Sequence, residues 1–328
     1  MVFSTACVCN DKMIFFDENS GIPGIYDVNS NTIRPYKVLR RLFITEHGTF
    51  QTIFSSNGDI FAVEESAEKI YKFNHKCAEL TSIDLAVERK PWGNFAGIYL
   101  YNDSIWLFMK NASLVIVDIN TNECKYKKLS VDPDLSCVFG MNVYMISTDG
   151  ESLVSFNMQT GDINVLKHFR KIKSPSYMYA DGKYICLYLR QGKVMMIERV
   201  TGEIMREFDA PANMDYIIRC KNRIWFLPHR MNDDIYYKDI DCSRMYKYDA
   251  YPFDFGYIGK EGWCAFMPGV RWENYLVFTP RTTTHLLFID LQSGDLVWRK
   301  PNVDQAGVLN FVLEKNIIMV NYYLKENI

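Results

Sequence analysis

A short phrase recurs along the whole 328-residue chain and constrains its fold more than any other feature. It consists of three or four apolar residues, then Asp, Asn or Glu, two variable residues, Ser or Thr, a turn residue and an acidic residue. Another strand-like segment follows. The clearest copies cover residues 286–298, 153–163 and 194–204, and shorter ones cover 115–123 and 70–79. A chain built from such copies is a repeat protein.

The polar residue that ends each apolar run is here called the anchor. Successive anchors lie about 40 to 50 residues apart, which is the length of a propeller blade of four strands. The side chain of an anchor can accept hydrogen bonds from the turn backbone, and the following Gly permits a tight reversal. The predicted anchors are Asp27, Asn74, Asp118, Asn157, Glu198, Asp249 and Asp290.

Two further strands precede each anchor. An aromatic-rich segment lies upstream of the anchor and follows a turn of Asn, Asp or Gly. A short inner strand, such as 95–99 or 264–267, precedes that turn. No long segment has helical periodicity, so the sequence predicts an all-β fold of four-stranded antiparallel blades. The predicted second strands cover 59–63, 104–108, 142–146, 183–187, 223–227 and 274–278.

The anchor phrase resembles the repeats of the β-propeller superfamily, of quinoprotein-like, YVTN and Kelch-like type, over essentially the whole chain. The resemblance implies a propeller and says little about function, because propellers host many unrelated activities. The Trp that follows the turn in quinoprotein repeats is present only at Trp298. The Trp-Asp pairing of WD40 blades and the Kelch double glycine are absent. We therefore expect no quinone and no other cofactor.

The chain ends leave the blade number open between two arrangements. Taking Asp17 as an anchor predicts seven blades, the last built from both termini, with segments 307–313 and 317–323 as its first two strands. Such closure would remove sheet edges. Eight blades, one of them incomplete, is the alternative. In either case residues 1–328 are predicted to form a single domain.

Composition excludes several classes of partner. The 37 basic and 39 acidic residues give a net charge of −2, which argues against nucleic-acid binding. Apolar runs are too short to span a bilayer, so no membrane association is expected. The N-terminal segment lacks the basic residues of a signal peptide, and the nine cysteines are irregularly spaced. We expect a cytoplasmic monomer with reduced cysteines.

Two long loops, 228–243 and 250–263, are expected on the same face of adjacent blades. Extended loops on a rigid scaffold are common recognition sites, and Trp, Tyr and Arg are common anchors in them. The histidines and the Cys7-Val-Cys9 pair do not have the spacing of a metal site. The candidate ligand-binding residues are Trp92, His229, Arg230, Asp234, Tyr236, Tyr237, Trp263, Arg281 and His285.

The sequence favours a non-catalytic binding or scaffold propeller that recognises a protein or a carbohydrate-like ligand on this face. The alternative is an enzyme, a lyase or hydrolase acting on a sugar or another small polar substrate. In that case His229 or His285 would act with Arg230 or Arg281. The identity of the ligand and of the catalytic residues, if there are any, lies beyond the sequence.

Overall fold

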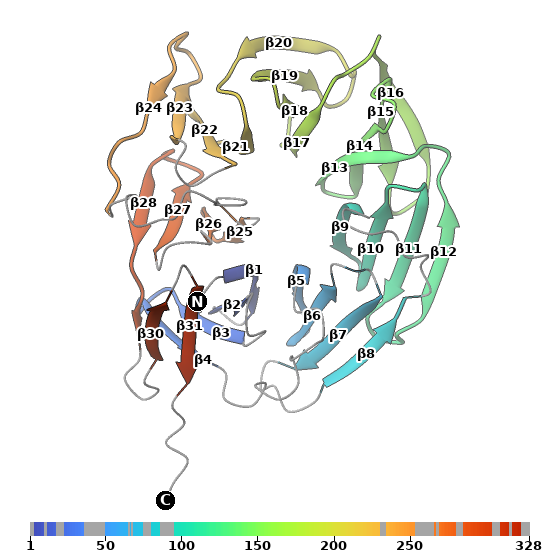
Figure 1. Ribbon diagram of the computed structural model, residues 1–328. Coiled ribbons are helices and arrows are strands. Elements are labelled where there is room, and N and C mark those ends of the chain that lie inside the picture. The colour runs from blue at the N-terminus through green and yellow to red at the C-terminus, as the bar shows by residue number, and fades with distance from the viewer. Residues whose placement is uncertain are drawn as a thin grey trace, which may run out of the picture. The chain divides into compact units, whose positions relative to one another are not determined.

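Seven sheets, each with four consecutive antiparallel strands, make up this computed structural model (Figure 1). Each sheet matches one repeat of the sequence, so the predicted all-β class and seven blades are confirmed. No helix occurs among the residues that the structure describes. These are 3–9, 12–17, 23–35, 50–64, 66, 68–74, 80–85, 95–229, 234–252, 266, 269–279, 285–303, 309–314 and 317–322.

The chain divides into two compact units. One comprises Met1–Ala86 and Arg219–Ile328, and the other comprises Val87–Ile218. The prediction of a single domain over residues 1–328 stays a prediction.

Blades one and two open the chain in the first unit. Blade one consists of β1 (Phe3–Cys9), β2 (Lys12–Asp17), β3 (Pro23–Asp27) and β4 (Thr32–Pro35). Blade two consists of β5 (Phe50–Ser56), β6 (Asp59–Glu64), β7 (Lys69–Asn74) and β8 (Leu80–Asp84).

Blades three to five form the second unit. Blade three consists of β9 (Phe95–Tyr101), β10 (Ser104–Met109), β11 (Ser113–Asp118) and β12 (Cys124–Lys128). Blade four consists of β13 (Pro133–Phe139), β14 (Asn142–Ser147), β15 (Ser152–Asn157) and β16 (Ile163–His168). Blade five consists of β17 (Pro175–Ala180), β18 (Tyr184–Leu189), β19 (Lys193–Glu198) and β20 (Ile204–Asp209).

Blades six and seven follow. Blade six consists of β21 (Met214–Arg219), β22 (Arg223–Pro228), β23 (Tyr236–Asp239) and β24 (Tyr246–Lys247). Blade seven consists of β25 (Val270–Trp272), β26 (Tyr275–Phe278), β27 (Leu286–Asp290) and β28 (Leu296–Arg299). The inner strand predicted at 264–267 is therefore displaced to β25, and most of 264–267 lies outside the described residues. All six predicted second strands are confirmed, as β6, β10, β14, β18, β22 and β26.

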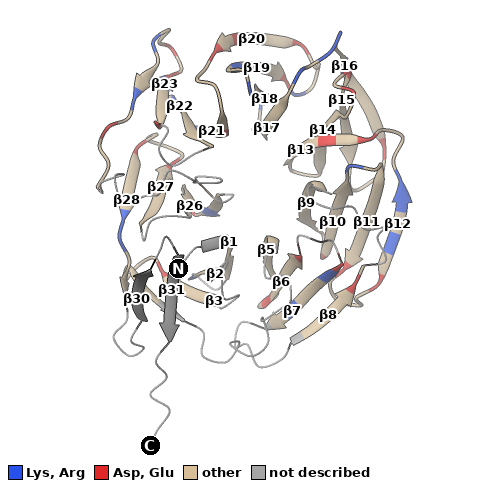
Figure 2. Ribbon diagram, viewed as in Figure 1, with Lys and Arg blue, Asp and Glu red and all other residues tan. Residues whose placement is uncertain are grey.

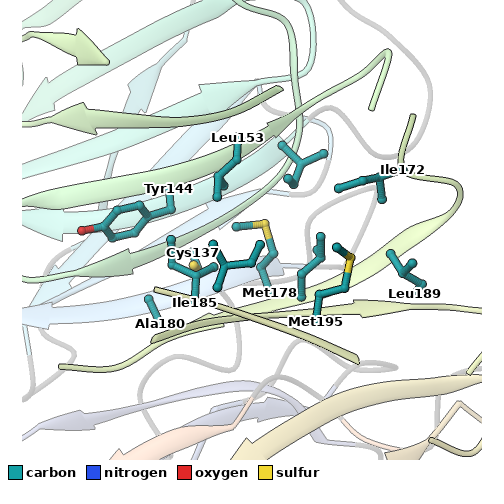
Figure 3. Close-up of a cluster of buried hydrophobic side chains, with 12 residues drawn as sticks. Cys137, Tyr144, Leu153, Ile172, Met178, Ala180, Ile185, Leu189 and Met195 are labelled. Atoms are coloured by element: carbon teal, nitrogen blue, oxygen red, sulfur yellow. The ribbon is translucent and has the colours of Figure 1, made fainter. Parts of the chain in front are cut away.

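Neighbouring blades share clusters of buried apolar side chains. Figure 3 shows one such cluster, to which β18 contributes Ile185 and Leu189 and β14 contributes Tyr144. Both faces of β18 are buried, because a second strand lies between two neighbouring blades. Fully burying one such side chain contributes about 1.5 to 3 kcal/mol to stability. The apolar character of these strands therefore explains why the blades stack.

The anchors act as the sequence predicts. The Oδ1 atom of Asp118 accepts hydrogen bonds from the backbone N–H groups of Asn120 at 2.8 Å and Thr121 at 2.9 Å. Asn157 accepts the equivalent bonds from Gln159 at 2.9 Å and Thr160 at 3.1 Å. The same two-bond pattern occurs at Asp27 and Asp290. The repeated polar residue is thus a device that closes the turn after the third strand.

Replacing Asp118 by Asn is expected to leave stability at neutral pH little changed, because Asn157 closes the same turn with an amide. The two hydrogen bonds lower the pKa of Asp118, first the bond from Thr121 and then that from Asn120. A carboxylate with a lowered pKa stabilises the fold above its unfolded pKa, and this stability is lost as the pH falls through the folded pKa. Wild type should therefore lose more stability than Asp118→Asn between pH 6 and pH 3, roughly the titration range of Asp. Denaturant unfolding at both pH values measures this, and parallel losses would contradict it.

Blade six requires a correction to the predicted anchors. Its third strand is β23, which ends at Asp239, whereas Asp249 follows the outermost strand β24. The backbone N–H of Ile240 donates to the Asn222 carbonyl at 3.0 Å, as Leu291 after the anchor of blade seven donates to Asn274 at 2.8 Å. The anchor of blade six is therefore Asp239, and β23 divides the loop predicted at 228–243.

The chain ends also differ from the prediction. Blade one is complete within residues 3–35, because β2 ends at Asp17 and a third strand follows that ends at the true anchor, Asp27. The blade shared by both termini is therefore not what the sheets show. Instead β29 (Asn302–Val303) adds to β4 as a fifth, parallel strand. Strands β30 (Leu309–Glu314) and β31 (Ile317–Tyr322) pair with each other in a separate hairpin.

The first and last blades contact each other within their unit. Met13 and Tyr26 of blade one share a buried cluster with Leu286 and Phe288 of blade seven. The rings of Tyr26 and Phe288 are 6.4 Å apart. Packing and the added strand β29 together join the two ends of the repeat.

Candidate functional site

Five of the nine candidate residues lie in the described part of the chain, all in the unit that carries blades six and seven. His229 follows β22, Asp234 precedes β23, Tyr236 and Tyr237 lie in β23, and His285 precedes β27. The other four, Trp92, Arg230, Trp263 and Arg281, lie outside the described residues. A binding role for these nine residues stays a prediction.

Asp234 is the centre of a polar group at the edge of blade six. Lys247 of β24 forms an ion pair with its carboxylate at 2.8 Å, and this bond raises the pKa of Lys247. The Tyr236 hydroxyl donates to the same carboxylate at 3.5 Å. Tyr236 and Lys247 are direct partners across β23 and β24. The sheet register therefore holds the group together.

Tyr237 lies on the opposite face of β23, in a row of rings that crosses the blade. Trp225 of β22, Tyr237 of β23 and Tyr246 of β24 are consecutive partners in the register. The rings of Trp225 and Tyr237 are 5.0 Å apart, and those of Tyr237 and Tyr246 are stacked at 5.2 Å. Aromatic cross-strand pairs of this kind stabilise a sheet beyond their buried area. We call these three residues the aromatic row.

The inner end of the row is held by structural contacts. Trp225 is 2% exposed, and its indole N–H donates to the Gly294 carbonyl of blade seven at 2.8 Å. Arg223 donates from Nε to Asp239 at 2.9 Å and lies 4.6 Å from the centre of the Tyr237 ring. Trp225 is therefore a packing residue, and Tyr237 is fixed between it and Arg223.

The outer end of the row is less buried and carries groups that the sequence did not single out. Tyr246 is half-buried, and Arg244 is exposed with its guanidinium 5.3 Å from the Tyr246 ring. The Arg244 backbone N–H and the Tyr246 hydroxyl both interact with the Cys242 sulfur, at 3.3 Å and 3.7 Å, and lower the pKa of that thiol. The pattern of residues 245–249 predicts an anchor strand here. The structure shows that it forms β24, the outermost strand of blade six.

Tyr251, in the segment after β24, contacts the segment that precedes β23. Its hydroxyl accepts a hydrogen bond from the Ile235 N–H at 2.9 Å, and burial raises its pKa to about 12. Its ring is 5.4 Å from that of Tyr248, which in turn is 5.6 Å from Trp225. Segments 234–236 and 248–251 are thus held together by rings and one hydrogen bond.

Of the candidate catalytic groups, the histidines His229 and His285 lie in the described part of the chain. Burial lowers the pKa of His285, and nearby Lys300 lowers it further, so its imidazole is neutral at pH 7. No group of three or more His, Cys, Asp or Glu side chains placed to hold a metal ion occurs in the described part of the chain. Of the predicted arginine partners, neither Arg230 nor Arg281 is described.

Comparisons with known proteins inform the fold. No family model matches the chain, and no curated protein matches it either. The structure of a computationally designed protein, Ika8, is similar with a TM-score of 0.59 and 9% identity over 90% of this chain and 86% of that one. That likeness concerns the fold alone. The seven four-stranded blades show that the chain has a β-propeller fold.

Two further structures resemble this propeller. PorZ, a surface component of the type-IX secretion system of Porphyromonas gingivalis, has a TM-score of 0.59 and 11% identity. The match covers 91% of this chain and 38% of PorZ. BamB from Moraxella catarrhalis has a TM-score of 0.46 and 17% identity over 67% of this chain and 65% of that one. At 11% identity the likeness to PorZ concerns the fold alone and leaves function open.

In the described part of the chain, no helix is long and apolar enough to cross a bilayer.

Proposed function

We propose that this propeller is a non-catalytic binding protein that recognises a protein partner at the edge of blade six. The edge comprises Asp234, Tyr236, Tyr237, Arg244, Tyr246 and Lys247. The observation that carries the proposal is the aromatic row, whose outer rings are half-buried and fixed in place. Rigid Tyr rings beside an exposed Arg are typical anchors of protein interfaces, because little side-chain entropy is lost on binding.

The remaining expectations belong to the same proposal. We propose that the protein acts in the cytoplasm, as a monomer, without a cofactor, nucleic acid or membrane. Burial raises the pKa of the Cys137 thiol, and nearby Cys186 raises it further. Both residues are thiols and do not form a disulfide with each other, which supports a reducing compartment. We also propose a ligand-binding role for the other candidate residues, Trp92, His229, Arg230, Trp263, Arg281 and His285.

The test is capture of partners from an extract by the immobilised full chain, followed by mass spectrometry. Comparison with the double variant Arg244→Glu/Tyr246→Ala is the decisive arm. Both side chains lie at the outer edge, so melting should change little. We expect at least one protein to bind wild type and to be reduced about tenfold or more with the variant.

The matched control changes Lys125, Lys127 and Lys128 of strand β12 in blade three to Glu, and it should retain the partner. A partner set that is the same for wild type and the double variant would overturn the proposal.

A thermal-shift panel of sugars, nucleotides, divalent metals and EDTA tests the alternative of an enzyme or carbohydrate binder. A ligand at a hundredfold excess over its Kd adds about 2.7 kcal/mol to native stability. A shift with one class of small molecule that is lost in Arg230→Ala or Trp263→Ala would replace the proposed protein partner by a small-molecule site. Absence of any shift is the result that we expect.

A further inference from the structure

Strand β12, the outermost strand of blade three, has an unusual charge. Its five residues, Cys124 to Lys128, include three lysines and no acidic residue (Figure 2). The chain as a whole has a net charge of −2. The outer strand of blade five, β20, carries Arg206 balanced by Glu207 and Asp209. The positive charge of β12 is therefore a local feature.

The three lysines are available to a partner. Lys125, Lys127 and Lys128 are all exposed, and in the described part of the chain none of them forms an ion pair. Lys127 lies 5.9 Å from the Phe156 ring of blade four, which orients it along the blade surface. Tyr126, between them, is 52% exposed. An acidic ligand would therefore meet three cations and one exposed ring.

At alternate residues of β12, the backbone N–H and C=O groups point away from the neighbouring strand β11. The sheet order is β12-β11-β10-β9, so β11 covers one side of β12 only. The Asp118 N–H donates to the Glu123 carbonyl at 3.0 Å, and the Leu129 N–H donates to the Ala112 carbonyl at 2.7 Å. Hydrogen-bonded pairs alternate in an antiparallel ladder, so Lys125 and Lys127 bond to β11. The N–H and C=O groups of residues 124, 126 and 128 consequently point away from β11.

The same chain shows that an outer edge of this fold accepts another strand. Strand β29 adds to β4 of blade one in parallel, with Asn302 opposite Thr32 and Val303 opposite Ile33. The Asn302 N–H donates to the Asn31 carbonyl at 2.7 Å. Addition of an extended segment to a sheet edge is also a common mode of peptide recognition.

Lysine on an edge strand also serves to prevent aggregation, because a charged edge discourages pairing with other strands. A single cation is present on the outer strands β24 and β28. Three cations in five residues go further, since they repel a basic strand and attract an acidic one. We propose that the outer edge of β12 binds an extended acidic segment of another protein, which adds to blade three as a fifth strand.

The probe is a fluorescent peptide of about eight residues in which Glu and Val alternate, a length typical of a strand. Its binding to the full chain is measured by fluorescence polarisation at low and at physiological ionic strength. A peptide of alternating Lys and Val is the charge control. A peptide that repeats Glu-Pro-Pro, here called the Glu-Pro peptide, is the control for strand addition, because its Pro residues remove N–H groups on both edges of the strand. Only the Glu-Val peptide should bind, and more weakly as salt rises.

Two sets of variants separate charge from strand pairing. Changing Lys125, Lys127 and Lys128 to Glu should weaken binding about tenfold or more. Tyr126→Pro removes an N–H that points outward and leaves the bonds to β11 intact, so the fold should tolerate it. Tyr126→Thr also removes the ring but keeps that N–H. We expect Tyr126→Thr to bind the peptide and Tyr126→Pro to lose it, with similar melting temperatures for both.

Several results would overturn the proposal. Equal binding by Tyr126→Pro and Tyr126→Thr, or equal binding of the Glu-Pro and Glu-Val peptides, would show charge attraction without strand addition. Tighter binding of a DNA duplex or of phosphatidylserine vesicles, lost in the triple Glu variant, would identify a different class of partner. Self-association that the same variants abolish would identify a second copy instead. The blade-six variant Arg244→Glu/Tyr246→Ala should bind the peptide normally, so this test and that of the proposed function fail independently.

Discussion

Replacing Trp225 by Ala is expected to lower the free energy of unfolding by about 3 to 5 kcal/mol, the usual cost of removing a large buried ring. The indole is 2% exposed and contacts Tyr237 and Tyr248. It also donates its N–H to the Gly294 carbonyl, which joins blade six to blade seven. The substitution therefore leaves a cavity and removes the shorter of the two hydrogen bonds that the Gly294 carbonyl accepts. Denaturant unfolding followed by far-ultraviolet circular dichroism measures the loss.

Trp225→Phe separates the two contributions. It retains most of the ring volume and removes only the hydrogen bond, so we expect a loss of about 1 to 2 kcal/mol. Tyr246→Ala, at the half-buried outer end of the row, should cost less than Trp225→Ala. If Trp225→Ala and Tyr246→Ala were equally mild, the assignment of Trp225 as a packing residue would be wrong.

Gly202→Ala should be the second severely destabilising change, with a loss of about 4 kcal/mol or more. Gly202 has a φ of 72°, a conformation that L side chains rarely adopt. A Cβ atom there would lie 2.3 Å from the carbonyl oxygen of Leu166 in blade four. Because that atom is backbone, it cannot move aside without disturbing β16. The shift in the denaturant midpoint measures the effect.

Gly140→Ala is the matched control. Gly140 also has a positive φ, of 59°, but a Cβ atom there would meet nothing within 4 Å. Only conformational strain of about 1 to 2 kcal/mol is then expected. Equal effects at the two glycines would mean that the contact between the Gly202 turn and Leu166 is not close in solution.

Local signals explain why so much of the blade pattern was predictable. Second strands such as β14 and β18 combine apolar residues with a preceding turn of Asn, Asp or Gly, and both features act over a few residues. The anchor turn at Asp118 likewise depends on side-chain and backbone atoms within three residues. No distant contact is needed for either, so a single sequence contains them.

The mistaken anchor in blade six shows where this reasoning ends. Residues 236–239 and 246–249 both consist of two Tyr and one Lys followed by Asp, and their local patterns are nearly equivalent. The hydrogen bond from Ile240 to Asn222 distinguishes them, and it joins residues that are far apart in the chain. The candidate residues show the same limit. Tyr236 and Tyr237 could be selected by composition, but their partners Asp234, Lys247 and Trp225 depend on sheet register.

The sequence by itself determined the all-β class and the repeat length, because alternation and turn chemistry are short-range properties. Only the tertiary structure decided between seven and eight blades and how the ends meet. β29 has two residues, too few for any pattern, and it pairs with β4 only because the folded chain brings residue 302 beside residue 32. It also decided that Trp225 is core and that three lysines of β12 lie on an outer edge. Burial and edge position are properties of the assembled sheets, and strand periodicity does not contain them.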